Sequence, residues 1–156
     1  MLARPLVRRC VRALSIVTLA FVAQTALAGV KDKAVSVEAN STVTREGRDL
    51  AATVRESAEK QVASMDMTKV PKASRFVVSA SLVGLDTDVK TENAVIDARV
   101  SVTIRDGRTG ALRAMLSGKA KAETMRRAVV MGEDKAIEAA VESALSRMPE
   151  VLRKVR

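Results

Sequence analysis

Two runs of alternating apolar and polar residues, joined by a short glycine-containing segment, constrain this chain more than any other feature. Apolar side chains recur with a period of two over residues 96–104 and again over residues 112–122. This period places them on one face of a β-strand. Residues 106–110, Asp-Gly-Arg-Thr-Gly, are typical of a tight hairpin because glycine adopts positive φ at no steric cost. The sequence therefore predicts two antiparallel strands, each with one buried face.

Other periodic segments predict the rest of the domain. Residues 76–82 alternate like a further strand, and residues 34–39 form a candidate edge strand. Apolar residues spaced by three or four indicate amphipathic helices over residues 45–65 and 133–148. Thr42 or Thr44 is the expected N-cap of the first helix. Pro149 either kinks the second helix or opens a short terminal one.

This order of elements predicts an α+β two-layer sandwich, in which two helices pack on one face of an antiparallel meander of three to four strands. Residues 45–156 would form the single α+β domain, and residues 29–44 a poorly defined N-terminal segment or edge strand. The uncovered face of the sheet would carry five basic side chains, with Asp97 and Glu123 beside them. The five are Arg99, Arg105, Arg113, Lys119 and Lys121.

Residues 1–28 are organised like a cleavable secretory signal peptide. Arginines without acidic residues precede an apolar run at residues 13–23, and small residues follow at Ala26 and Ala28. Signal peptidase requires small residues at these positions, so cleavage is predicted between Ala28 and Gly29. The run is shorter than the roughly 20 apolar residues that span a bilayer. We therefore expect a periplasmic or secreted protein, which would contact a membrane only through an uncleaved signal peptide.

Composition excludes several catalytic chemistries. The chain has no histidine, and its one cysteine, Cys10, lies in the predicted signal peptide. A histidine-based triad and a thiolate nucleophile are therefore not available to the mature chain. Ser57 and Lys60 match the S-x-x-K motif of penicillin-interacting enzymes, but the S-D-N and K-T-G elements that complete it are absent. We expect a protein without catalytic residues or a cofactor.

A metal site is not expected either. Asp86, Asp88 and Glu92 lie close together between two predicted strands, and such oxygen-rich segments can hold calcium. Lys90 occupies a position where an EF-type loop has a ligand, and the glycine of such a loop is missing. The sequence therefore indicates a solvated hairpin loop.

The charge changes when the signal peptide is removed. Four of the 27 basic residues lie in it, so 23 remain against 18 acidic residues, a net charge of +5. These charges are interspersed rather than grouped in blocks. Attraction to anionic envelope components is compatible with this balance, whereas export separates the chain from nucleic acid.

The hairpin at residues 106–110, its flanking strands and the alanine-rich segment at residues 136–145 resemble a group of small bacterial periplasmic domains. They include the penicillin-binding-protein activator lipoproteins, the curli-secretion lipoprotein and the N-terminal domain of the Tol-system propeller protein. Unlike those lipoproteins, this chain has no lipobox cysteine at the end of its apolar run. The resemblance implies an accessory or assembly role in the envelope, without catalysis.

Two surfaces are candidates for binding. Residues 128–131 form an apolar docking segment if they lie outside the core, as exposed apolar patches often mark interaction sites. The segment consists of Ala128, Val129, Val130 and Met131. It would bind another envelope protein, whereas the basic sheet face would bind an envelope polyanion or a lipid phosphate. The sequence leaves both alternatives open.

Overall fold

The computed structural model describes residues 35–66 and 75–154, which belong to one compact unit, Lys31–Arg156. The predicted cleavage site between Ala28 and Gly29 lies outside the described residues. The elements are, in chain order, β1 (Val35–Ser41), α1 (Leu50–Ser64), β2 (Phe76–Val89), β3 (Asn93–Asp106), β4 (Leu112–Met125), the 3₁₀ turn η1 (Arg126–Ala128), α2 (Val129–Leu145) and α3 (Met148–Lys154).

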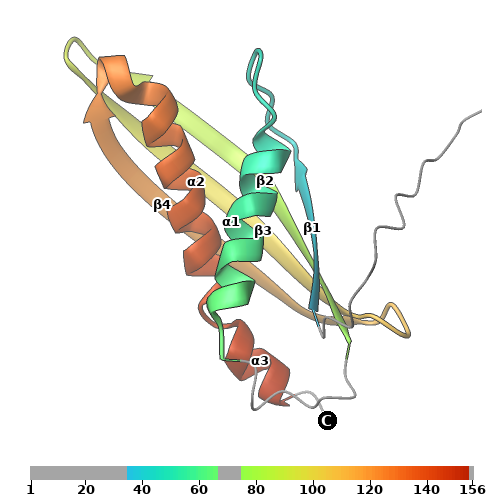
Figure 1. Cartoon of the computed structure of the whole chain (residues 1–156). Coiled ribbons are helices and arrows are strands. Elements are labelled where there is room, and N and C mark those ends of the chain that lie inside the picture. Colours follow the sequence, from blue (N-terminus) through green and yellow to red (C-terminus); the bar gives the residue numbers. More distant parts are fainter. Residues whose placement is uncertain (1–34, 67–74, 155–156) are drawn as a thin grey trace, which may run out of the picture. The chain divides into compact units, whose positions relative to one another are not determined.

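The strands form one mixed sheet in the order β1-β2-β3-β4 (Figure 1). The antiparallel meander predicted for the three long strands is confirmed, with Val102 opposite Ala80 on one side and Leu116 on the other. The edge strand β1, however, pairs with β2 in parallel. A parallel pair needs a long crossover connection, and α1 is part of it. The α+β prediction is confirmed, but the sheet is mixed rather than wholly antiparallel.

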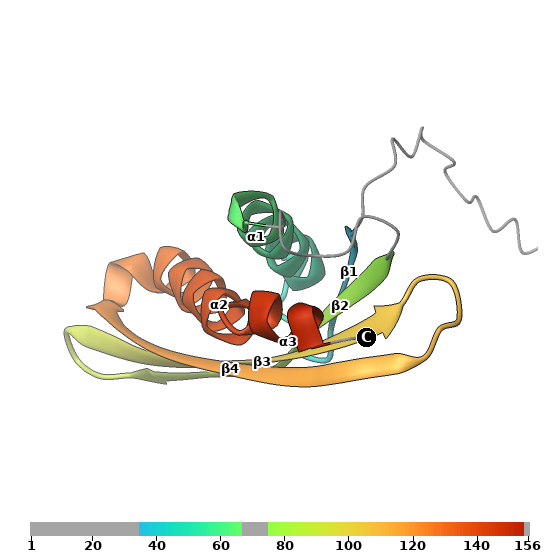
Figure 2. The same ribbon diagram turned by 90° about the horizontal axis from the view of Figure 1, so that it is seen from below.

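Both long helices pack on the same face of the sheet, and the opposite face is bare of any described element (Figure 2). Helix α1 lies against β1 and β2, while α2 lies against β3 and β4. The buried side chains of β3 follow the predicted alternation throughout. They are Ala94, Ile96, Ala98, Val100, Val102 and Ile104.

Both helices begin at positions other than those predicted. Helix α1 starts at Leu50 rather than at residue 45, because the Asp49 side chain caps it by accepting a hydrogen bond of 3.1 Å from the Ala52 amide. Neither Thr42 nor Thr44 is the cap. Helix α2 starts at Val129, four residues before the predicted start, and follows η1 directly. The predicted short terminal helix is present as α3.

The strands also differ from the prediction in two places. Asp86 and Asp88 lie within β2, so the predicted acidic loop contains only residues 90–92. Leu112, predicted to face the core, is 57% exposed. The register between β3 and β4 shifts at Arg105, which pairs with Leu112, and the irregularity reverses the alternation there.

Candidate functional site

One end of the sheet brings together two segments that are far apart in the sequence, the β2–β3 hairpin and the stretch from the end of β4 into α2 (Figure 1). The end of β2 and the start of β3 form a short hairpin, in which the Lys90 amide donates to the Asn93 carbonyl at 2.8 Å. The end of β4 lies beside this hairpin, because Met125 pairs with Asn93. The chain then enters η1, where the Arg126 amide donates to the Glu92 carbonyl at 2.8 Å. Helix α2 therefore begins at the same end.

Gly132 explains how the first turn of α2 is oriented. A Cβ atom at this position would lie 2.7 Å from the Ile96 Cδ1 atom and 2.7 Å from the Thr124 Cγ2 atom, so the helix touches the sheet here. Successive residues in a helix are about 100° apart around the axis. Val130, two positions before Gly132, therefore points away from the sheet, whereas Met131 is turned to the side and lines the groove between α1 and α2. Both side chains are more than half exposed.

The predicted docking segment at residues 128–131 is thus split by the helix. Val130 and Met131 are exposed, while Ala128 and Val129 are half-buried. Two further exposed apolar side chains lie at the same end, Val89 at the end of β2 and Met125 at the end of β4. The sequence does not indicate either residue as part of this surface, because Val89 follows residues predicted to form a loop and the last strand is predicted to end at residue 122.

We call this end the tip surface and define it by the exposed residues that form it. They are Val89, Lys90, Met125, Arg126, Arg127, Val130 and Met131. Four of the seven large apolar side chains that are exposed in the described residues lie here. Such gathering of apolar side chains at one end differs from single exposed residues, which are normal on any protein surface.

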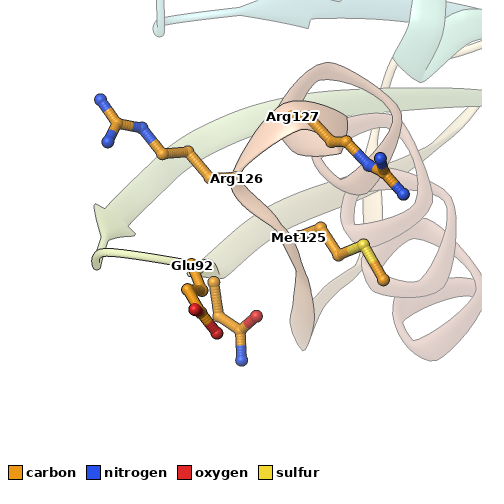
Figure 3. A pocket seen from close by; sticks show the side chains of 5 residues that line it. Glu92, Met125, Arg126 and Arg127 are labelled. Atoms are coloured by element: carbon orange, nitrogen blue, oxygen red, sulfur yellow. The ribbon is translucent and has the colours of Figure 1, made fainter.

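An open hollow of about 730 Å³ adjoins the tip surface and is lined by Glu92, Asn93, Met125, Arg126 and Arg127. Figure 3 shows that the Arg126 and Arg127 side chains leave the backbone in opposite directions, and that Glu92 points away from both. Among the described residues, neither guanidinium forms an ion pair with an acidic side chain. The hollow therefore has two arginines available for an external anion.

The predicted basic residues are exposed, but acidic residues share their surface. Arg99 forms an ion pair with Asp86, and Arg113 donates to Asp106 at 2.8 Å. Lys121 lies opposite Asp97 in the register of the sheet. Arg105 and Lys119 are also exposed and, among the described residues, have no ion pair.

Further acids follow from the register. Glu38 of β1 accepts a hydrogen bond from Ser79 on the uncovered face, and Asp88 lies opposite Val95. Because β2 extends past residue 86, Asp86 and Asp88 join Asp97 and Glu123 on this face. The sequence interpretation placed these two aspartates in a loop, and so it predicted a more basic surface than the structure has.

A groove between α1 and α2 contains the S-x-x-K pair. Ser57 and Lys60 both line it, with Glu138 and Lys135 across from them on α2. Ser57 is only 8% exposed, whereas the Lys60 ammonium is exposed and paired with Glu138. The hydrogen bond and the charge of Glu138 raise the pKa of Lys60 above its usual value. An ammonium held in its protonated form does not accept a proton from the serine hydroxyl.

A buried charge network joins the β1–α1 connection to α2. Glu133 is 4% exposed, and its carboxylate accepts hydrogen bonds from Arg48, from Arg45 at 3.3 Å and from the Thr87 hydroxyl at 3.0 Å. Arg48 also pairs with Asp134, and Arg45 donates to the Leu85 carbonyl at 2.8 Å. Buried charges are retained when they are paired and hydrogen-bonded. Among the described residues, no buried side-chain nitrogen or oxygen lacks a hydrogen-bond partner.

Within the described ranges, no helix is both long enough and apolar enough to cross a bilayer. The same ranges contain no group of three or more acidic, histidine or cysteine side chains placed to hold a metal ion. Asp86, which was considered as a calcium ligand, is paired with Arg99.

No protein-family model matches this chain, and no curated protein does. Solved structures do match. A hypothetical protein of Chlamydia trachomatis is 14% identical, with a TM-score of 0.55 over 76% of this chain and 96% of that one. A lipoprotein candidate from Caulobacter crescentus is 14% identical, with a TM-score of 0.47 over 77% and 88%. The PelC dodecamer of Paraburkholderia phytofirmans gives 16% identity and a TM-score of 0.47 over 72% and 85%.

The Chlamydia protein shares the fold of this chain, which is a class of small α+β sandwiches with two helices on one face of the sheet. Identity of 14% establishes the fold alone. The three structures are not the accessory domains that the sequence resembles, and that resemblance stays a prediction.

Proposed function

We propose that this protein is an exported, non-catalytic binding domain of the bacterial cell envelope, and that it docks through the tip surface. One observation carries the proposal: exposed apolar side chains from β2, β4 and α2 gather at a single end of the fold, beside two arginines without ion pairs. Burial of apolar surface is the main favourable contribution to association. A partner that covers this end would remove these side chains from water.

The non-catalytic part of the proposal is supported by the groove between the helices. Its only motif with a known catalytic use, Ser57 and Lys60, holds a lysine that Glu138 keeps protonated. The buried carboxylate of Glu133 is occupied by structural hydrogen bonds. Neither site has a base positioned to activate a nucleophile.

The tip surface is favoured over the uncovered sheet face. On that face Asp86, Asp97 and Glu123 accompany the basic side chains, and two of the five are already paired. An approaching polyanion would meet charges of both signs, which cancel over short distances in salt.

Export can be tested by purifying the tagged protein from the periplasm of a bacterial host and sequencing its N-terminus. The proposal expects a mature chain that begins at Gly29 and is found in the periplasmic fraction. A chain that keeps residues 1–28 and stays in the cytoplasm would overturn the envelope assignment.

Contact through the tip surface can be tested by photo-crosslinking in living cells. A photoreactive amino acid is placed at Val130, with matched positions at Ser117 on the uncovered sheet face and at Arg108 in the β3–β4 hairpin. All three side chains are exposed. The proposal expects adducts from position 130 and few from the other two, identified by mass. Equal yields at all three positions, or adducts only from Ser117, would contradict it.

A further inference from the structure

We infer that the tip surface binds an anionic phospholipid bilayer, with Arg126 and Arg127 at the phosphate groups and the exposed apolar side chains in the interfacial layer. This inference rests on the proposed function and names the component that the domain contacts. It assigns membrane contact to the folded domain itself, whereas the sequence predicts such contact only through an uncleaved signal peptide.

The first observation that supports membrane binding is the charge of Arg126 and Arg127. Arg45, Arg48, Arg99 and Arg113 all have acidic partners in the structure. The adjacent guanidinia of η1 have none among the described residues, although Glu92 is close in space. A guanidinium presents several donors in a planar fork that matches the oxygens of a phosphate. Because the two side chains leave η1 in opposite directions, each guanidinium can contact a separate phosphate, which suits a surface on which phosphates are densely repeated (Figure 3).

The acidic residues at this end do not cancel that charge. Glu92 lines the hollow but points away from both arginines (Figure 3). Glu123 accepts a hydrogen bond from the Asn93 side chain at 3.2 Å. Asp88 lies on the uncovered sheet face rather than beside η1. Lys90, in the hairpin, adds a third positive charge to the tip surface.

The second observation that supports membrane binding is the exposure of apolar side chains beside these arginines. Val130 and Met131 follow the two arginines within one helical turn, and Met125 precedes them directly. Methionine is flexible and polarizable, and so it adapts to an irregular surface. Interfacial elements bind membranes by combining such apolar side chains with basic ones that contact anionic headgroups. The order found here, apolar residues on both sides of two arginines, provides both parts.

The position of the patch and its composition favour a bilayer over a protein. The patch occupies the end of the sheet opposite to Val35, where the described chain begins, and Figure 1 shows the β2–β3 hairpin and the start of α2 together at this end. The apolar residues of the tip surface are valines and methionines, and the hollow beside them is open rather than enclosed. Protein–protein hot spots cluster in well-packed, desolvated pockets, which this open end does not offer.

The test is co-sedimentation with vesicles. Purified wild-type protein is mixed with vesicles of phosphatidylcholine that contain phosphatidylglycerol, and with vesicles of phosphatidylcholine alone. All variants share the same N-terminal segment, so its contribution is common to every sample. We expect binding to the anionic vesicles only, weakening as salt rises, since each basic residue near the surface contributes about 1 kcal/mol.

The Arg126→Gln and Arg127→Gln double variant should bind at least about tenfold more weakly, by the same contribution per residue. The Arg153→Gln and Lys154→Gln double variant is the matched control, because it removes the same charge from exposed positions at the end of α3 (Figure 1). It should bind like the wild type. Met125→Ser with Met131→Ser should also weaken binding, but leave its salt dependence unchanged. Inorganic phosphate added in solution should not displace the protein from the vesicles.

Each outcome decides between the sources of the ligand. If the two charge variants lose vesicle binding to the same extent, net charge alone explains the binding, and the inference is overturned. Displacement by inorganic phosphate would assign the arginines to a soluble anion. If no vesicle binding occurs but position 130 still cross-links to a protein or to a second copy of the chain, the inference fails while the proposed function stands. If neither vesicle binding nor a cross-link from position 130 is observed, both the inference and the proposed function are overturned.

Discussion

Gly118 of β4 lies so close to α2 that a Cβ atom on it would come within 2.0 Å of the Ala140 carbonyl oxygen and 2.5 Å of the Ala144 amide nitrogen. Ala140 and Ala144 of α2 are buried, and their short side chains allow the helix to approach the sheet. The sheet contributes a glycine at the same point. The contact fixes where α2 crosses β4, and thereby where its first turn reaches the tip surface.

Gly118→Ala should therefore destabilise the protein severely, by about 3 kcal/mol or more, because backbone atoms of a packed helix must move to admit one methyl group. Gly47→Ala is the matched control. Gly47 has a φ of +69° and no atom within 4 Å of an added Cβ. The Gly47→Ala substitution should lower the free energy of unfolding by only about 1 kcal/mol, through backbone strain. Urea unfolding measures both, and similar losses in the two variants would contradict the close packing.

Glu133→Gln should reduce the free energy of unfolding by about 3 kcal/mol, because it removes the charge that Arg45 and Arg48 share in a buried site. Glu138→Gln changes an exposed partner of Lys60 in the same helix and is the control. Exposed pairs contribute little, so that variant should unfold close to the wild type. Hydrogen exchange of residues 43–49 should rise only in Glu133→Gln. An unchanged exchange rate there would show that the network does not hold this connection.

Acid should weaken the β3–β4 hairpin through Asp106. Its carboxylate accepts hydrogen bonds from Arg113 at 2.8 Å and from the amides of Arg108 and Thr109, and these bonds hold its pKa well below the usual range. A carboxylate whose folded pKa lies below the unfolded value of about 3.9 stabilises the fold above that pH. This contribution is lost as pH falls further.

Urea unfolding from neutral pH to strongly acidic pH measures this effect. Wild-type stability should decline below about pH 4, where an unfolded carboxylate becomes protonated. Asp106→Asn lacks the titrating group, so it should be less stable at neutral pH and decline less steeply. Parallel curves for the two proteins would refute the role of Asp106.

Ser57 should not react with acylating antibiotics. The S-x-x-K mechanism needs a lysine that can take the serine proton, and the carboxylate of Glu138 keeps Lys60 protonated. Incubation with a fluorescent penicillin, followed by gel electrophoresis, should leave the protein unlabelled. Labelling that disappears in Ser57→Ala would establish a catalytic serine and contradict the non-catalytic proposal.

Local patterns predicted those parts of the fold that depend on local geometry. The alternation over residues 96–104 identified the buried side chains from Ile96 to Ile104 correctly, because side chains on a strand alternate whatever the strand pairs with. Ala94 of β3 is also buried and was not predicted. The stripe of α1 was also correct at Leu50, Val54 and Ala58. The cap at Asp49 was missed because serine, threonine and aspartate are all good caps.

The candidate site could be predicted only in part. Val130 and Met131 were identified as an apolar segment that would matter if it lay outside the core. Their exposure depends on the phase of α2, which Gly132 sets through contacts with Ile96 and Thr124. Met125 joins them because β4 continues to this end. These contacts join residues distant in the sequence, so no local period contains them.

The sequence by itself determined the α+β class, the buried faces of the strands and helices, and the scarcity of catalytic side chains, since all of these follow from residue types and their spacing. Only the tertiary structure decided that β1 is parallel to β2, that Asp86 neutralises Arg99, and that the apolar ends of β2, β4 and α2 form one surface. The physical reason is that pairing, charge compensation and exposure are properties of neighbours in space, which packing of the whole chain brings together.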